Sequence, residues 1–162
     1  MLKCEYLLEK FGGHKYAAGL TIKKQNLNSF IKEFEKVVAN TITKDQLVAE
    51  IEVDMEIELE EVNDKLYRII KQFAPFGPMN RTPNFITKSV TDSGKGRKVG
   101  EDKSHLRLTL NTLNKDLISI GFSMGDDFEK ITDNKPFDIC YSIDENTWNG
   151  TTSLQLRLKG VK

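Results

Sequence analysis

The stretch His105-Leu106-Arg107-Leu108-Thr109-Leu110 alternates leucine with polar residues at every position. Because successive side chains of a β-strand point to opposite faces, this period of two predicts a strand with one buried and one exposed face. Other runs rich in apolar residues predict four more strands after Pro83. They are expected at Phe85–Thr91, Leu117–Phe122, Phe137–Ile143 and Leu154–Lys159.

A turn and a helix define the order of these strands. Asn149-Gly150 is a strong turn signal between the last two strands. A short helix fits Asp126–Ile131, between the third strand and the fourth. Five strands with a helix at this point are the order of an oligonucleotide-binding (OB) barrel. The sequence therefore predicts an α+β chain in which a partial α/β segment precedes a five-stranded OB-fold β-barrel over residues 84–162.

The first forty residues predict a helix, a glycine turn, a strand and a second helix. The apolar side chains of Cys4–Phe11 follow a helical spacing, and Gly12-Gly13 is expected to end that helix. A strand fits Ala17–Lys23, and the apolar stripe of the second helix begins at Leu27. These elements are too few to close a core, so residues 1–45 are expected to be the end of a larger α/β domain.

Residues 46–83 are expected to connect these two parts. Within them, residues 50–60 alternate apolar with acidic side chains, which predicts a half-buried strand. The acidic row is interpreted as a solvated face, because no His or Asn joins it to make a metal site. A helix is expected over Val62–Phe73, and the prolines and glycine of Pro75–Pro83 predict a fixed, non-helical connection.

Composition narrows the class of protein. The 162 residues are 38% hydrophobic and 30% charged, as in a soluble folded protein. No apolar run approaches ~18 residues, so no membrane span is expected. Glu5 comes before any long apolar core forms, so no signal peptide is expected either. Two cysteines, Cys4 and Cys140, cannot build a disulfide framework or a four-ligand zinc site, and we expect reduced thiols in a cytoplasmic protein. The net charge is zero, so a polyanion would have to bind to local basic patches.

Two predicted loops carry candidate nucleic-acid contacts. Residues 92–103 combine three glycines with cations that suit phosphates, and residues 144–151 hold the single tryptophan. Tryptophan can stack on a base, which is worth ~1–3 kcal/mol per base. The alternatives are a flexible solvated loop and a tryptophan that plugs the barrel end. Because both loops lie on the same side of an OB barrel, we favour nucleic-acid binding, with these residues as candidates: Lys95, Arg97, Lys98, Lys103, Arg107 and Trp148. Phe85 and Phe122 are further candidates for stacking.

A second candidate site is Gly12-Gly13-His14, where exposed amides and an imidazole suit a phosphate. The longer pattern Gly-Gly-His-x-x-Ala-Ala-Gly is more specific. The segment Phe11–Leu20 resembles the signature of the DHH-associated domain of the RecJ family of single-stranded-DNA-specific exonucleases. Pro75–Phe85 resembles that family's Phe-Gly-x-Gly-Asn-Pro-x-Pro stretch. It matches at Phe76, Gly77, Asn80 and Pro83 and departs at Met79 and Arg81.

The resemblance implies a function that the residues alone do not show. Members of the family degrade single-stranded DNA from the 5′ end, in DNA repair and recombination, with Mn²⁺ or Mg²⁺ held in an N-terminal DHH domain. In that family the Gly-Gly-His motif, here Gly12, Gly13 and His14, faces the metal and holds a substrate phosphate, and the OB-fold binds DNA. This sequence has two histidines, His14 and His105, and no Asp-His-His motif. The chain is therefore expected to be an inactive C-terminal fragment that binds single-stranded DNA without a metal or cofactor of its own.

Two alternatives remain open. One is a protein-interaction module in which Trp148 anchors a partner such as a single-stranded-DNA-binding protein. The other is the tail of another DHH-type phosphoesterase or of an alanyl-tRNA-synthetase-like editing protein. Neither of these tails normally carries a barrel at the position that follows Pro83 in this chain.

Overall fold

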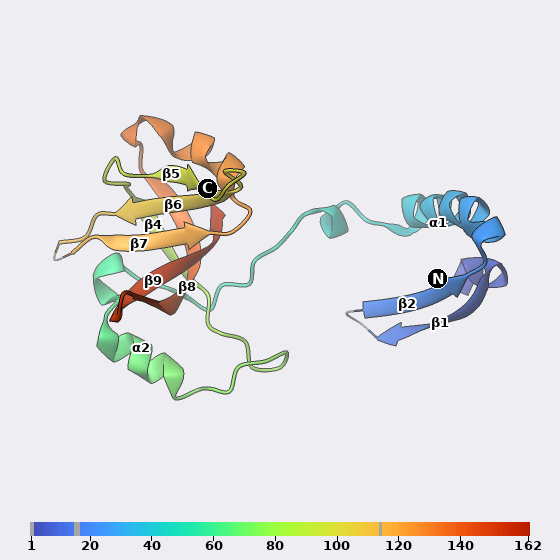
Figure 1. The fold of residues 1–162 in the computed structure, drawn as a ribbon, viewed down its shortest axis with the longest axis horizontal. Helices are drawn as coiled ribbons and strands as arrows, with labels where there is room; N and C mark the ends of the chain where they lie inside the picture. Colours follow the sequence, from blue (N-terminus) through green and yellow to red (C-terminus); the bar gives the residue numbers. More distant parts are fainter. Residues whose placement is uncertain (1, 15–16, 114) are drawn as a thin grey trace. The chain divides into compact units, whose positions relative to one another are not determined.

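A computed structural model describes residues 2–14, 17–113 and 115–162, and the chain divides into two units, residues 1–50 and 51–162 (Figure 1). Within the described residues, no helix combines the length and the apolar character needed to cross a membrane.

The first unit is a β-hairpin followed by a helix. Strands β1 and β2 are antiparallel, with Gly12 opposite Gly19 and Gly13 opposite Ala18. Phe30 of α1 is buried, and its ring stacks on that of Phe34 at 5.4 Å. The elements of this unit are η1 (Leu2–Leu7), β1 (Leu8–His14), β2 (Ala17–Ile22), η2 (Lys24–Asn26), α1 (Leu27–Thr41) and η3 (Asp45–Leu47).

The helix expected up to Phe11 is wrong, because the 3₁₀ helix η1 ends at Leu7 and the chain continues as β1. Glycine is a poor helix former, and pairing with β2 satisfies the backbone of Gly12 and Gly13 within a ribbon. Gly13 is required there, since a Cβ atom at this position would lie 2.6 Å from the Cα of Ala18. The glycines therefore belong to a strand and do not end a helix.

The second unit is built on a seven-stranded sheet of order β3-β4-β8-β9-β7-β6-β5. Strands β7 and β9 are parallel, as are β3 and β4, and the other neighbours are antiparallel. All five predicted strands are present as β4, β6, β7, β8 and β9. The bounds are β3 (Met55–Glu56), η4 (Leu59–Glu61), α2 (Asp64–Lys71), β4 (Phe85–Val90), β5 (Arg97–Val99), β6 (His105–Leu110), β7 (Leu117–Gly121), η5 (Gly125–Asn134), β8 (Phe137–Trp148) and β9 (Thr151–Val161).

The core lies on the face of the sheet to which the leucines of β6 point. Leu106, Leu108 and Leu110 are fully buried, which confirms the alternation. Tyr141 of β8 is buried with them and shares a hydrogen bond of 2.9 Å with Thr87. Phe85 is also buried, with its ring 6.1 Å from that of Tyr141, so its predicted role in stacking is wrong.

The strand expected over residues 50–60 forms only at Met55–Glu56. It pairs with the start of β4, and the flanking backbone bonds are Asp54 N to Asn84 O (2.9 Å) and Ile57 N to Ile86 O (3.0 Å). Strand pairing is limited to this short stretch, so Ile51, Val53 and Met55 remain exposed while Ile57 and Leu59 are buried. An alternating pattern did not suffice to make a long strand, because only Met55 and Glu56 pair with β4 before the chain turns into η4 at Leu59.

Three other predicted segments differ in detail. Residues 92–103 contain the short strand β5, paired with β6, which was expected as loop. The predicted helix at Asp126–Ile131 is the 3₁₀ helix η5. Residues 144–151 are the end of a β8–β9 hairpin rather than a loop. The Asn149-Gly150 turn is confirmed, with φ of 48° and 77° as a two-residue hairpin turn requires.

Candidate nucleic-acid interface

Three arginines from three strands lie in one row across the sheet. The register places Arg97 of β5 opposite Arg107 of β6, Arg107 opposite Ile120 of β7, and Ile120 opposite Arg157 of β9. Residues directly opposite one another share a face of the sheet. Because Leu106 and Leu108 point to the core, this row occupies the outer face. We call Arg97, Arg107 and Arg157 the arginine row.

The charges of the arginine row are uncompensated. Arg97 and Arg157 are exposed, Arg107 is half-buried, and none of the three forms an ion pair with any residue that the structure describes. Like charges directly opposite each other on neighbouring strands destabilise a sheet. The arrangement is therefore unfavourable for the free protein and favourable for binding a polyanion, since guanidinium groups bind phosphate through paired hydrogen bonds.

An aromatic ring lies beside the arginine row. Phe122 follows β7, and 55% of its surface is exposed. The guanidinium of Arg157 lies 5.2 Å from the centre of this ring, and the ring of His105 meets it edge-on at 5.3 Å. His105 is held in turn, because its Nδ1 accepts a hydrogen bond of 3.1 Å from the backbone N–H of Ser123. Phe122 is thus a positioned, exposed ring of the kind on which an unpaired base can stack.

The lysines predicted in the 92–103 segment behave differently from the arginines. Lys95 lies 3.2 Å from Asp116, and Lys98 lies 3.9 Å and 3.7 Å from Asp126 and Glu129. Their charges are therefore partly neutralised within the protein. Lys103 occupies a turn with a positive φ of 57°. Of the predicted cations, the structure brings Arg97 and Arg107 together on one face.

The 92–96 turn is held by one carboxylate, which argues against a flexible solvated loop. Asp92 accepts hydrogen bonds of 2.8 Å from the backbone N–H of Gly96 and from that of Thr109. These two bonds connect the turn to β6. They therefore position the start of β5, where Arg97 lies. Asp92 is a positioning residue for the row, and its role was not predicted from the sequence.

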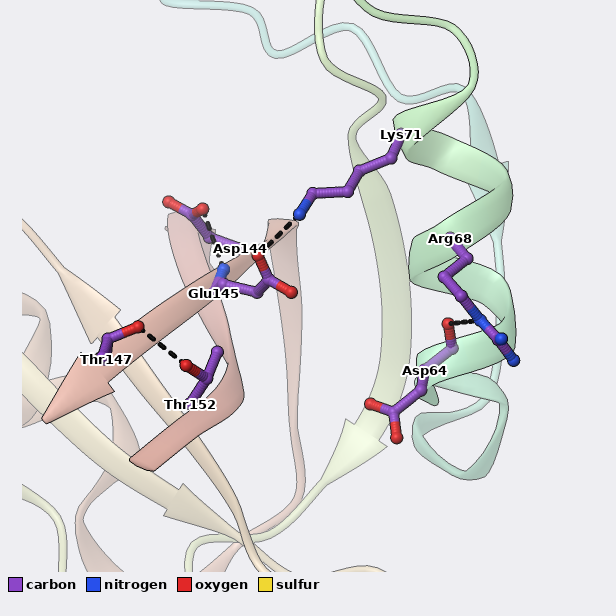
Figure 2. Close-up of polar contacts among 7 residues, drawn as sticks. All are labelled: Asp64, Arg68, Lys71, Asp144, Glu145, Thr147 and Thr152. Carbon is purple, nitrogen blue, oxygen red and sulfur yellow. Dashed lines mark hydrogen bonds and ion pairs between the residues drawn. The ribbon is translucent and has the colours of Figure 1, made fainter. Parts of the chain in front are cut away.

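Trp148 lies at the end of β8, opposite Thr151, and 73% of its surface is exposed. This exposure excludes the alternative of a tryptophan that plugs the end of the predicted barrel. The hairpin around it carries Asp144 and Glu145 and no basic residue between positions 144 and 153. Its side chains are paired locally, as at Thr147 and Thr152, whose hydroxyls lie 2.9 Å apart (Figure 2). A role for Trp148 in binding DNA stays a prediction, and its surroundings do not attract phosphate.

Gly12, Gly13 and His14 lie in β1 of the first unit. The two residues after His14 in the Gly-Gly-His-x-x-Ala-Ala-Gly pattern, at positions 15 and 16, lie outside the described part of the chain. The structure explains Gly13 by the close approach of β2, while a Cβ atom at Gly12 would meet nothing within 4 Å. Gly12 therefore has no steric requirement of this kind, and the phosphate role of the three residues stays a prediction.

Metal-ligating side chains are dispersed over the part of the chain that the structure describes. Across residues 2–14, 17–113 and 115–162, no three His, Cys, Asp or Glu side chains gather as metal ligands do. Cys4 and Cys140 are buried free thiols, and burial raises the pKa of Cys140.

Sequence reasoning missed Arg157 as a site residue. The alternation of Leu154, Leu156 and Leu158 already placed Arg157 on the polar side of its strand. The missing information was the pairing of β9 with β7, a parallel contact between segments far apart in the sequence. Phe122 was a stacking candidate, and the structure leaves it exposed beside the row.

Comparison with known proteins gives the family. The family model described as the RecJ OB domain matches residues 53–160. The chain is 27% identical over 157 residues to the single-stranded-DNA-specific exonuclease RecJ of Bacillus subtilis, covering 97% of this chain and 20% of that protein. It is 28% identical over 153 residues to the Haemophilus influenzae protein of the same name, covering 93% of this chain and 26% of that protein.

A solved structure shares the fold. The crystal structure of RecJ in complex with Mg²⁺ from Thermus thermophilus superimposes with a TM-score of 0.71 at 21% identity, over 99% of this chain and 24% of that one. The chain thus spans about a fifth to a quarter of the length of these proteins. Since the family model covers most of the sequence, the chain belongs to the RecJ OB domain family.

Proposed function

We propose that this chain binds single-stranded DNA across the outer face of β5, β6, β7 and β9. The observation that carries the proposal is the arginine row, three guanidinium groups on one exposed face without carboxylate partners among the described residues. Phe122 beside Arg157 supplies a ring for an unpaired base. A base is free to stack on such a ring when it is not already paired in a duplex, which favours the single strand as ligand.

We infer that β4, β6, β7, β8 and β9 are the five strands of an OB barrel. Two hydrogen bonds support this, Ser93 N to Thr109 O at 2.8 Å and Asn111 N to Thr91 O at 3.2 Å. They join the segment after β4 to β6, near the opposite end of the strand order. In OB-folds the second and third strands form the binding face, and these correspond to β6 and β7 here.

The test is fluorescence anisotropy with a labelled oligonucleotide at increasing salt. Three phosphate contacts give a logarithmic salt slope of about −2 for a single strand, so the affinity should fall about 20-fold between 50 and 200 mM salt. A duplex of the same length should bind more weakly. Absence of binding at 50 mM, or binding that does not respond to salt, would contradict the proposal.

For the whole protein we propose a cytoplasmic 5′-to-3′ exonuclease of single-stranded DNA that acts in DNA repair and recombination. Its Mn²⁺ or Mg²⁺ would be held in a DHH domain outside this chain, and Gly12, Gly13 and His14 would contact a substrate phosphate. The similarity to proteins named as single-stranded-DNA-specific exonucleases supports this. This chain by itself should release no nucleotides from a labelled oligonucleotide, with or without added Mn²⁺.

A second function, protein binding, is favoured by one observation. Trp148 is exposed at the end of a hairpin that carries carboxylates and no basic residue. Such a ring suits an interface anchor for a protein partner, for example a single-stranded-DNA-binding protein. Trp148→Ala should then abolish binding of that protein and leave oligonucleotide affinity unchanged. If it weakens oligonucleotide binding instead, by the 1–3 kcal/mol expected of a stacked base, roughly 5- to 150-fold, Trp148 contacts DNA.

A further inference from the structure

A cleft of about 680 Å³ adjoins the arginine row on the second unit. It lies between α2, the connection that follows α2, and the outer face of β8 and β9. Its volume falls within the range of about 300–1,000 Å³ typical of ligand pockets. The lining residues that matter here are Tyr67, Lys71, Phe76, Arg81, Arg157 and Lys159.

Arg157 belongs both to the arginine row and to this cleft. Lys159 lies two residues further along β9, at a shift in the pairing register with β8, and lines the same cleft. Like Arg157, it forms no ion pair within the part of the chain that the structure describes. The uncompensated positive charge of the row thus continues into the cleft, whose lining also includes one carboxylate, that of Asp144.

The opposite wall is held rigidly by the Pro-Phe-Gly-Pro-Met-Asn stretch. The side-chain amide of Asn80 donates to the carbonyl oxygens of Phe73 (2.7 Å) and Pro75 (3.0 Å), and Gly77 and Asn80 exchange two backbone bonds. This fixed turn places Phe76 and Arg81 on the cleft. This stretch lies outside the arginine row and its strands.

The cleft combines cations with half-buried aromatic rings. Tyr67 and Phe76 supply the rings. Lys71 extends from α2 toward the β8–β9 hairpin, where its Nζ lies 2.7 Å from Glu145 (Figure 2). Arg81 lies 3.4 Å from Glu52. Both of these acidic partners are exposed, so a phosphate can compete with them at little cost.

We propose that this cleft binds a nucleotide of the same single strand that crosses the arginine row, with Arg157 as the shared contact. Lys159 and Arg81 bind its phosphate, and Tyr67 and Phe76 contact its base. The inference rests on the proposed function and extends it, because it gives the strand a path that leaves the sheet at β9 and ends against α2. An acidic peptide is the competing occupant, and the rings beside the unpaired cations favour the nucleotide.

The test measures affinity against oligothymidylate length. Wild-type affinity should rise with length until the cleft is filled and then level off. Lys159→Ala and Arg81→Ala should keep the affinity for short oligonucleotides and lose part of the gain with length. Each should reduce the magnitude of the salt slope for long oligonucleotides by about 0.7, which is roughly 3-fold in affinity per 4-fold change in salt. Glu145→Gln should strengthen long-oligonucleotide binding, because it releases Lys71.

Two matched controls lie on α2, outside the residues that line the cleft. Lys65 is exposed on α2 and does not line the cleft. Arg68 donates to the carbonyl oxygen of Asp64 at 3.3 Å and points away from the hairpin (Figure 2). Lys65→Ala and Arg68→Ala remove the same charges as Lys159→Ala and Arg81→Ala, and they should leave the length dependence unchanged.

The outcomes separate this inference from the function on which it rests. If short oligonucleotides fail to bind, the proposed function itself is wrong. If they bind but Lys159→Ala matches Lys65→Ala at every length, the nucleotide site is wrong and the DNA-binding face stands. If an acidic peptide binds wild type but not Lys159→Ala, while oligonucleotide length dependence is the same in both, the cleft takes a protein segment and the inference is overturned.

Discussion

Arg107→Gln removes the middle charge of the arginine row and should weaken DNA binding. Losing one phosphate contact changes the salt slope from about −2.1 to about −1.4. If the lost contact is purely electrostatic, the affinities of variant and wild type converge near 1 M salt. The variant should then bind a single-stranded oligonucleotide about 8-fold more weakly at 50 mM salt and about 3-fold more weakly at 200 mM. Fluorescence anisotropy at both concentrations measures this directly.

The same substitution should stabilise the free protein. Arg97 lies directly opposite Arg107, and a charge pair on facing strand residues is worth roughly 0.2–1 kcal/mol, which is unfavourable when the charges are alike. Removing one of them should raise the free energy of unfolding by up to about 0.5 kcal/mol at low salt. The gain should disappear at 0.5 M salt, where exposed charges are screened. Urea unfolding at the two salt concentrations gives both values.

Arg68→Gln on α2 is the matched control, since it removes an exposed arginine outside the row. It should change neither the affinity nor the salt dependence of stability. The reasoning is refuted if Arg107→Gln binds DNA as wild type does. It is also refuted if the substitution destabilises the protein at low salt, because the arginine would then have a structural role.

Three further predictions concern the scaffold. Asp92→Ala should lower the free energy of unfolding by about 1–3 kcal/mol in urea, because two backbone N–H groups lose an acceptor at 2.8 Å, and unchanged stability would contradict this. Gly13→Ala should disrupt the first hairpin, because a Cβ atom there would lie 2.6 Å from the Cα of Ala18, whereas Gly12→Ala should be tolerated. Hydrogen exchange measures the difference, and equal protection of the hairpin in the two variants would contradict the prediction. Burial raises the pKa of Tyr141 from 10.0 to about 12, so the unfolded state loses this proton first and stability should fall as the pH rises from 10 to 12. Tyr141→Phe should flatten that fall while costing about 1 kcal/mol at pH 7 through the lost bond to Thr87, and an unchanged pH profile would count against it.

The sequence predicted the strands best where the core decides the structure. Leu106, Leu108 and Leu110 alternate in the sequence and are all buried, because a single strand register satisfies all three. Asn149-Gly150 predicted its turn correctly, since few residue pairs accept positive φ at both positions. Local pattern and tertiary packing agree in these elements.

Prediction failed where the outcome depended on a distant partner. Cys4–Phe11 carries a helical spacing, but Leu8–His14 pairs as a strand with β2. Residues 50–60 carry a strand pattern, but only Met55 and Glu56 pair with β4. The candidate site shows the same limit. Arg97 and Arg107 were predicted as binding residues, but their alignment with Arg157 depends on the β7–β9 pairing, which no local pattern encodes.

The most direct test of the DNA-binding face is a titration of the isotopically labelled chain with a short single-stranded oligonucleotide, followed by NMR at each backbone amide. We predict that the largest shifts cluster on β5, β6, β7 and β9 around Arg97, Arg107, Ile120 and Arg157, and that they diminish in Arg107→Gln. Shifts confined to the Trp148 end of the hairpin, or to the first unit, would contradict the assignment of the arginine row as the site that binds DNA.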